Sequence, residues 1–155
     1  MSQQASVRIL GAHDVRLIAP ILATAFDADY YEAWSVEQIV EALALPNTVL
    51  LGCEMHSRHL GFALMRTLLD ESELLLIALA GDARRRGLGS LLLTEVINLV
   101  REQGARRLFL EVRVNNFAAK FYEHQNFRVI GVRPNYYRKK DGKTVDAQTM
   151  AIDIN

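Results

Sequence analysis

A short basic segment with two glycines has the composition of an anion-binding loop. It reads Arg-Arg-Arg-Gly-Leu-Gly-Ser over residues 84–90 and stands directly before a long apolar segment with helical spacing. Glycines at 87 and 89 would let a ligand approach the backbone, and a helix start leaves its first N–H groups unpaired and partly positive. These features suit a pyrophosphate group. A basic turn without any ligand has the same composition, and the pattern matches neither a P-loop nor a dinucleotide-binding fingerprint.

A single carboxylate interrupts an apolar segment further along the chain. Glu111 stands near the end of the predicted strand Leu108–Val112, and ligands of open α/β sheets bind beyond the carboxyl ends of strands. Glu111 could therefore face a ligand site, or be a surface residue that faces solvent or pairs with an arginine. Tyr122 follows Phe121 in a short predicted helix. We expect Phe121 to pack in the core and Tyr122 to place its hydroxyl elsewhere.

Hydrophobic periodicity predicts the elements that would position these residues. Ser35 and Gln38 form a capping box that should start a helix, and Gly104 and Asn126 should end two later helices in the left-handed conformation. The predicted helices are 15–26, 36–43, 88–103 and 117–124, and the predicted strands are 7–10, 48–55, 60–69, 74–80, 108–112, 127–137 and 145–154. The order predicts one α/β (α+β) domain over residues 1–155, with a mixed sheet of about seven strands and four helices.

Composition narrows the class of protein. The chain has 155 residues, of which 50% are hydrophobic and 23% charged, which fits one globular domain and excludes disorder. No apolar run reaches the roughly 20 residues that span a bilayer, and residues 1–6 lack a signal-peptide pattern, so we expect a cytoplasmic protein without membrane association. Cys53 is the only cysteine and the four histidines form no ligand pattern, so we expect neither a disulfide nor a metal site.

Charge is divided unevenly between the two halves of the chain. Basic and acidic side chains number 18 each, yet residues 1–80 contain 4 basic and 10 acidic side chains, and residues 81–155 contain 14 and 8. A chain that binds nucleic acid would more often be basic throughout. The division suggests one anionic and one cationic ligand, or no specific ligand.

Together these features resemble the GNAT superfamily of N-acetyltransferases. The acetyl-CoA loop of that superfamily reads Arg/Gln-x-x-Gly-x-Gly/Ala, and Arg84–Gly89 matches it. Within the superfamily, the chain is most similar to the bacterial ribosomal-protein-alanine N-acetyltransferases. The matching segments are Trp34-Ser35, Leu69-Asp70-Glu71, Ile77-Ala78-Leu79, Leu110–Arg113, Asn115–Phe127, Asn135-Tyr136-Tyr137 and Asp141-Gly142.

The resemblance implies the GNAT fold and direct acetyl transfer from acetyl-CoA to an amine, with no metal. Glu111 would be the general base, Tyr122 the general acid, and the Leu79 amide the donor to the developing oxyanion. The implied cofactor-binding residues are Ile77, Ala78 and Leu79 for the pantetheine arm, Arg84, Arg85, Arg86, Gly87, Leu88, Gly89 and Ser90 for the pyrophosphate, and Asn115 or Asn116. One residue fewer than usual separates Glu111 from Asn115, so the turn between them should differ from the family's pattern.

The acceptor site is predicted at two walls, the loop Asp27–Trp34 and the strand Arg133–Tyr137. The implied substrate-binding residues are Asp27, Asp29, Glu32, Trp34, Tyr136 and Tyr137; a solvated acidic loop and ordinary aromatic residues are the alternative. The resemblance implies acetylation of the N-terminal α-amine of a protein such as a ribosomal protein, by a monomer or dimer without nucleic acid or membrane partners. An α-amine has a pKa of about 7.7–8.0 and is deprotonated more easily than lysine. Alternatives are acetylation of a small-molecule amine, favoured if the groove is closed, and a noncatalytic acyl-CoA-binding module.

Overall fold

The computed structural model describes residues 4–26, 29–30 and 34–155. The predicted order of strands and helices is confirmed, as is the sheet of seven strands. The elements are β1 (Ser6–Leu10), the 3-10 helix η1 (Ala12–Ile18), α1 (Ala19–Thr24), α2 (Val36–Leu43), β2 (Thr48–Met55), β3 (Arg58–Leu68), β4 (Glu71–Leu79), the 3-10 helix η2 (Gly81–Ala83), α3 (Leu88–Glu102), β5 (Arg107–Arg113), α4 (Ala118–His124), β6 (Arg128–Arg138) and β7 (Thr144–Asp153).

Most observed boundaries lie within one or two residues of the predicted ones, and two differences are larger. The first predicted helix is divided into η1 and α1, and Pro20 stands in the first turn of α1. Proline has no N–H to donate to the preceding turn, so an α-helix restarts here instead of running through. The third strand of the meander begins at Glu71 and not at residue 74, because Glu71, Ser72 and Glu73 pair with both neighbouring strands.

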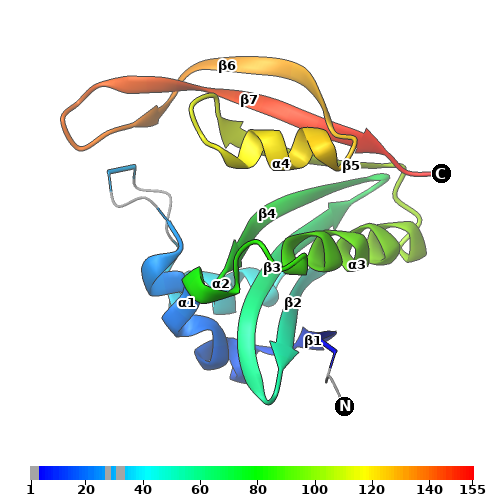
Figure 1. Ribbon diagram of the computed structural model, residues 1–155. Helices are drawn as coiled ribbons and strands as arrows, with labels where there is room; N and C mark the ends of the chain where they lie inside the picture. The colour runs from blue at the N-terminus through cyan, green and yellow to red at the C-terminus, as the bar shows by residue number, and fades with distance from the viewer. Residues whose placement is uncertain (1–3, 27–28, 31–33) are drawn as a thin grey trace.

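The sheet order is β1-β2-β3-β4-β5-β7-β6. Strands β1 to β4 are antiparallel, β4 and β5 are parallel neighbours joined through α3, and β7 lies antiparallel between β5 and β6. In Figure 1 the β6–β7 hairpin and α4 lie above, and β1 to β4 with α1, α2 and α3 lie below. Within the described residues, no helix has the length and apolarity to cross a membrane.

The sheet opens between β4 and β5. These strands are paired at only three positions, from Glu71 opposite Arg107 to Glu73 opposite Phe109. By contrast, β4 pairs with β3 at eight positions and β5 pairs with β7 at seven. Beyond Glu73, β4 therefore has one paired edge and one open edge.

Two apolar clusters cover the two faces of the sheet. The first contains residues of α3 and α4, including Leu92, Val96 and Tyr122, together with Leu108, Leu110 and Val112 of β5. The second joins η1, α1 and α2 to Phe62, Leu76 and Ala78 of the sheet. Side chains alternate along a strand, so Phe109, Glu111 and Arg113 face away from α4.

The predicted helix ends are confirmed where the local chemistry specifies them. The Gln38 N–H donates to Ser35 Oγ at 3.1 Å, and the Ser35 N–H donates to Gln38 Oε1 at 2.7 Å. Gly104 after α3 has φ 79° and Asn126 after α4 has φ 72°. Both are left-handed residues that follow the last helical turn, as expected for this kind of helix end.

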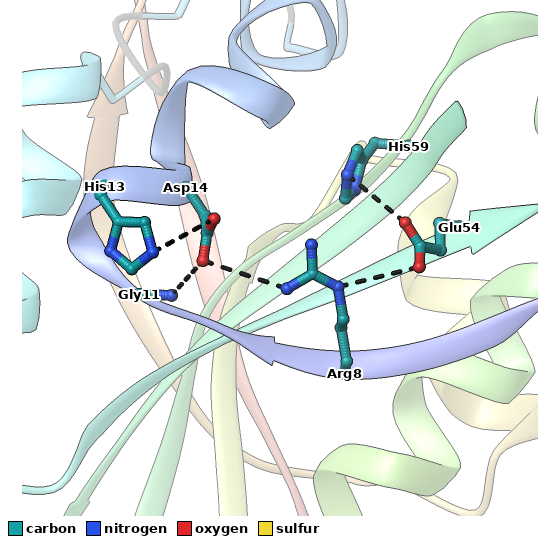
Figure 2. Close-up of polar contacts among 6 residues, drawn as sticks. All are labelled: Arg8, Gly11, His13, Asp14, Glu54 and His59. Atoms are coloured by element: carbon teal, nitrogen blue, oxygen red, sulfur yellow. Dashed lines mark hydrogen bonds and ion pairs between the residues drawn. The ribbon is translucent and has the colours of Figure 1, made fainter. Parts of the chain in front are cut away.

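A charged network joins the first strand to its neighbours (Figure 2). Arg8 lies 3.7 Å from Glu54 of β2 and 4.0 Å from Asp14 of η1, measured between side-chain nitrogen and oxygen. A backbone hydrogen bond from Gly11 holds the pKa of Asp14 below its ordinary value. The histidines of the network, His13 and His59, each lie 3.6 Å from a carboxylate. The network ties β1 and η1 to the meander, away from the opening between β4 and β5.

Candidate active site

The open edge of β4 exposes backbone groups in an alternating order. The Ala80 N–H donates to the Leu60 carbonyl of β3 at 2.8 Å, and Ala78 stands opposite Phe62 of the same strand. Backbone groups of successive residues point to opposite sides of a strand. The N–H and C=O groups of Ile77 and Leu79 therefore point into the opening, whereas those of Ala78 are directed to β3. Of the three predicted pantetheine contacts, two have backbone groups free for a ligand.

The basic loop shapes the start of α3. Arg85 has φ 63° and Gly87 has φ 79°, so the chain turns twice through the left-handed region before the helix begins. The first helical bond runs from the Leu91 N–H to the Gly87 carbonyl at 3.1 Å. This leaves the N–H groups of residues 88–90 without a partner in the helix, and the N-cap Gly87 offers no side chain to cap them. The helix start can therefore hold an anion.

Contacts on both sides fix this loop in place. Arg58 donates two hydrogen bonds to the carboxylate of Asp82, at 2.7 and 2.9 Å. These bonds keep the pKa of Asp82 below its ordinary value. On the other side, Gln125 Nε2 donates to Ser90 Oγ at 2.9 Å, which connects α3 to the end of α4. Because the Ser90 hydroxyl accepts this bond, both its O–H and the Ser90 backbone N–H can donate to a ligand.

The two loop glycines lie in different surroundings. A Cβ at Gly87 would have no heavy atom within 4 Å, and the residue is exposed. A Cβ at Gly89 would lie 3.4 Å from the Phe121 ring. Arg84, Arg85 and Arg86 are exposed around them. Gly87 suits the left-handed backbone conformation, whereas a Cβ at Gly89 would be in ordinary van der Waals contact with Phe121 of α4.

Glu111 lies on β5 beside the opening and is paired with an arginine. Its Oε1 accepts a contact from Arg133 Nε of β6 at 3.0 Å, and its side chain is 12% exposed. Arg133 stands opposite Ala147 of β7 and Glu111 stands opposite Thr149, so the Arg133 side chain reaches Glu111 diagonally across β7. The other carboxylate oxygen, Oε2, is buried and has no hydrogen-bond partner among the described residues. The carboxylate is thus held by one oxygen and has the other available to accept a hydrogen bond.

Tyr122 is buried in the first apolar cluster. It is 6% exposed, and its ring centroid lies 5.4 Å from that of Phe121 and 5.7 Å from that of Phe127. Burial raises the pKa of its hydroxyl, with a smaller contribution from Tyr137, so the hydroxyl keeps its proton. The prediction that Tyr122 points away from the core is wrong, because Ala119 and Tyr122 form the buried face of α4. Phe121 packs against the same cluster, as expected, but is only half-buried and lies beside Gly89.

Glu111 and Tyr122 lie on opposite faces of the sheet around β5. Leu110 and Val112, the neighbours of Glu111, belong to the cluster that contains Tyr122, so Glu111 itself faces the other way. A group inserted between β4 and β5 would meet a carboxylate from one face and a phenol from the other. This arrangement suits a displacement in which the nucleophile enters from one face and the leaving group is protonated from the other.

Comparisons with known proteins agree with this geometry. The family model described as "Acetyltransferase (GNAT) family" matches residues 19–127. The chain belongs to the GNAT acetyltransferase family. The chain is 34% identical over 138 residues to the [ribosomal protein bS18]-alanine N-acetyltransferase of Salmonella typhimurium, which covers 82% of the chain and 93% of that relative.

Two further comparisons show the extent of the similarity. The Haemophilus influenzae protein of the same name is 40% identical over 92 residues, 59% of this chain, and the match spans 63% of that relative. The crystal structure of the ribosomal-protein-S18-alanine N-acetyltransferase from Escherichia coli superimposes with a TM-score of 0.87 at 29% identity, over 98% of this chain and 95% of that one. The similarity of fold therefore extends over the whole described chain.

The two asparagines after β5 have different partners in this GNAT domain. Asn116 Oδ1 accepts from the Ala118 N–H at 2.9 Å and so supports the start of α4. Asn115 accepts from Arg113 at 2.9 Å and donates to the Tyr30 hydroxyl at 3.0 Å. The shortened turn after Glu111 is closed by the Asn116 N–H, which donates to the Arg113 carbonyl at 3.0 Å.

The two predicted walls of the GNAT acceptor site contact each other. The Lys140 N–H of the β6–β7 hairpin donates to the Asp29 carbonyl at 3.0 Å. Beside this contact, the Arg113 guanidinium stacks on the Tyr30 ring at 3.8 Å. Asp29 is exposed, whereas Tyr30 is 5% exposed. Asp27 and Glu32 lie outside the described residues.

The aromatic residues of the two predicted walls lie in different surroundings. Trp34 packs against the α1–α2 cluster. Tyr136 is 50% exposed, its ring lies edge to face with that of Tyr137 at 5.0 Å, and the Arg133 guanidinium lies 5.4 Å from the Tyr136 centroid. Arg133 thereby connects Tyr136 to Glu111. Among the described residues, no three histidine, cysteine or acidic side chains are grouped as metal ligands would be.

Three residues at this site had no individual role assigned to them from the sequence: Tyr30, Arg113 and Arg133. Tyr30 was an aromatic residue in a polar loop, a signal that could have indicated burial against another element. Arg113 occurs in a segment that matched the family, and Arg133 is the first residue of a predicted acceptor wall. Their partners lie 83 and 22 residues away in the sequence, so no local pattern could identify the contacts.

Proposed function

We propose that this GNAT enzyme transfers the acetyl group of acetyl-CoA to the N-terminal α-amine of a protein whose first residue is small, such as alanine. The main support for this reaction is the opening between β4 and β5, with Glu111 on one face of the sheet and Tyr122 on the other. The relatives from Salmonella typhimurium and Haemophilus influenzae are named for the alanine of ribosomal protein bS18, which supports the acceptor class. We place the whole activity in a single domain, residues 1–155.

The residues around the opening and the start of α3 have the chemical groups needed to bind acetyl-CoA. This cosubstrate supplies the acetyl group as a thioester on a carrier that contains a pyrophosphate. The N–H groups of Leu88, Gly89 and Ser90 would hold the pyrophosphate, because they lie at an uncapped helix start beside three exposed arginines. The outward-pointing backbone groups of Ile77 and Leu79 would bind the pantetheine arm as an added strand binds a sheet edge. Asn115 or Asn116 would add a contact at the start of α4.

Glu111 and Tyr122 would accept and donate the protons of the proposed reaction. Glu111 Oε2, which is buried without a partner among the described residues, would accept a proton from the incoming ammonium, directly or through one water. The Leu79 N–H would donate to the oxygen on which negative charge develops. Tyr122 would donate its proton to the departing thiolate. Its raised pKa keeps the hydroxyl protonated until that step, and burial beside Phe127 excludes competing water.

The acceptor amine would enter on the Glu111 face, between the loop that contains Asp29 and the strand that contains Tyr136 and Tyr137. Asp29, with Asp27 and Glu32, would attract a cationic chain end. Trp34 packs behind this loop and would support it. Tyr136 would bind the acceptor backbone, because half of its side chain is exposed next to Arg133.

One observation favours a second candidate, acetylation of a small-molecule amine. The hydrogen bond from Lys140 to Asp29 joins the two walls, and the stacking of Arg113 on Tyr30 supports the junction. A groove joined in this way has less space for a continuing polypeptide than for a compact amine. A substrate assay separates the two candidates.

The test is a panel of amines with purified protein and acetyl-CoA, followed by release of CoA. The panel contains an N-terminal peptide of ribosomal protein bS18, the same peptide with a blocked α-amine, an internal lysine peptide, a polyamine, an aminoglycoside and free alanine. We expect turnover of the free N-terminal peptide alone, with the acetyl group located on its first residue by mass spectrometry. Turnover of the polyamine, aminoglycoside or free amino acid without the peptide would establish the second candidate instead.

A further inference from the structure

Cations without a carboxylate partner gather at two places in the described chain. Most arginines on the strands are paired, each within 4.0 Å of an acidic side chain: Arg8, Arg58, Arg66, Arg107, Arg128 and Arg133. Residues 84–86 and 138–143, by contrast, each hold three or more cations that form no ion pair with any described residue. The proposed function assigns the first of these clusters to the pyrophosphate and gives the second cluster no ligand.

The second cluster lies at the turn between β6 and β7, and we call it the basic tip. It consists of Arg138, Lys139, Lys140 and Lys143, of which all but Lys139 are exposed. Asp141 is the single acidic residue between them, and its Oδ1 accepts a hydrogen bond from the Lys143 backbone N–H at 2.9 Å. The turn therefore contains four cations and one anion. In Figure 1 it forms the free end of the β6–β7 hairpin and projects beyond α4.

Contacts with the rest of the chain hold the basic tip in position. The turn is closed by the Lys139 N–H, which donates to the Lys143 carbonyl at 2.8 Å. The Lys140 N–H donates to the Asp29 carbonyl at 3.0 Å. Next to this bond, the Lys139 ammonium lies 5.8 Å from the centroid of the Tyr30 ring. The cations of the tip are thus presented on a turn that is fixed against the loop of the other acceptor wall.

The basic tip continues one wall of the proposed acceptor site outward. Arg138 lies two positions beyond Tyr136 on β6, which is roughly 7 Å along the strand, and the other cations of the tip lie farther out. An acceptor whose first residue is bound beside Tyr136 would have the rest of its chain near the tip. The tip is therefore placed to contact what surrounds the acceptor terminus, and not the amine that reacts.

Fixed cations of this kind suit phosphate groups. Lysine and arginine contacts to the phosphate backbone supply most of the sequence-independent affinity for nucleic acids. An interface with an acidic protein would need an apolar or aromatic centre, and residues 138–143 contain no apolar side chain. We propose that the basic tip binds the phosphate backbone of an RNA to which the acceptor protein is bound, so that the enzyme can acetylate the acceptor in its RNA-bound form.

This inference rests on the proposed function, because the proposed acceptors include ribosomal proteins, and these are bound to RNA in the ribosome. It differs from the expectation, stated from the sequence, of an enzyme without a nucleic acid partner. The net charge of the chain concealed the tip, because the acidic first half and the paired arginines cancel its charge.

The first test is direct binding of RNA. The probe is a fluorescein-labelled RNA hairpin, and its anisotropy is measured at about 50 to 200 mM salt with saturating CoA, which occupies the loop of residues 84–86. The logarithm of the association constant should fall with the logarithm of salt concentration with a slope of about −2 to −4 for two to four phosphate contacts. Arg138→Gln combined with Lys143→Gln should make this slope shallower by about 1 to 2 and weaken binding roughly tenfold or more.

The matched control combines Arg16→Gln with Lys120→Gln. Both residues are exposed, lie on η1 and α4, and form no ion pair with any residue that the structure describes. The control also removes one arginine and one lysine, and it should leave the affinity and the salt slope unchanged. Equal weakening by both double variants, or no binding of RNA by the wild-type enzyme, overturns the proposal. Equally tight, tip-dependent binding of polyglutamate overturns it in favour of an acidic protein partner.

The second test compares acetylation of ribosomal protein bS18 bound to ribosomal RNA with acetylation of its short N-terminal peptide. The tip variant, Arg138→Gln with Lys143→Gln, should lower kcat/KM several-fold for the RNA-bound protein and leave kcat/KM for the peptide unchanged. Equal losses for both substrates would place the two cations in the acceptor site itself and overturn the proposal.

The two tests also separate this inference from the proposed function. If no amine of the panel is acetylated while the tip still binds RNA, the proposed function fails and the RNA-binding surface stands. If the peptide is acetylated and RNA is not bound, this inference fails and the proposed function stands.

Discussion

Replacement of Gly87 by glutamate tests the cosubstrate loop most directly. Gly87 has φ 79° and is exposed, and a Cβ added at this residue would have no heavy atom within 4 Å. A side chain therefore fits, and the cost to folding is that of a left-handed residue, about 1 to 2 kcal/mol. For a chain of this length, such a loss lowers the melting temperature by roughly 2 to 8 °C. The variant should fold and remain measurable.

The same change places a carboxylate at the start of α3, where the pyrophosphate would bind. At about 5 Å, repulsion between two unit charges is roughly 1 to 3 kcal/mol for an effective dielectric constant between bulk water and a protein surface. Gly87 is exposed, so we expect the lower half of this range, which corresponds to about tenfold weaker binding of CoA. Calorimetric titration with CoA measures this change in affinity.

Two matched variants isolate the charge and the position. Gly87→Gln has the same backbone strain and nearly the same shape without the charge, and should bind CoA several times more tightly than Gly87→Glu. Gly142→Glu introduces the same residue at another open glycine with positive φ, 88°, in the β6–β7 turn, and should leave CoA affinity unchanged. Equal affinities for the two Gly87 variants would show that the pyrophosphate binds elsewhere.

Three other changes probe the site and its support. Tyr122→Phe should lower kcat on the order of 10²-fold while CoA affinity by calorimetry stays the same, because the hydroxyl acts on the leaving group; a selective loss of affinity would make it a binding group. Glu111→Gln should lower kcat/KM by roughly 10² to 10⁴-fold in CoA-release assays, and unchanged turnover would remove it as the base. Arg58→Gln should lower the melting temperature at neutral pH. Arg58 keeps the folded-state pKa of Asp82 below its unfolded value, so the pair stabilises the fold fully above that unfolded value, about 3.9. The difference from wild type should shrink below this pH and vanish once the pH is below the lower folded-state pKa; a difference that persists there would exclude the ion pair as its source.

The features that the sequence predicted well are those with local causes. The capping box at Ser35 and the left-handed residues Gly104 and Asn126 depend on contacts within a few residues, so the local sequence specifies them. The strand order also followed from hydrophobic spacing and short connections. The division of the first helix depends on Pro20, a local signal that the periodicity concealed.

The features that the sequence could not specify depend on distant partners. The rotation of α4 about its axis decides whether Phe121 or Tyr122 is buried, and only docking on β5 fixes it. The pairing of Glu111 with Arg133 and the stacking of Arg113 on Tyr30 join elements that are remote in sequence. The sequence indicated candidate residues for the chemistry, while their orientation depends on tertiary packing.

The short pairing of β4 with β5 gives this sheet an inner pair of strand edges in addition to its two outer ones. Open edges invite other chains to add strands, and proteins blunt them by shortening or bulging the edge strand. The outer edges here show both devices: β1 has only five residues, and β6 has irregular register near Gly131 and again between Arg133 and Tyr137. The free length of β4 after Glu73 is six residues, roughly 20 Å; its register with β3 shifts once, between Leu74 and Leu76, and is regular from Leu76 to Leu79. Under the proposed function, the outer edges of the sheet resist added strands, whereas the regular end of the inner edge receives an extended ligand.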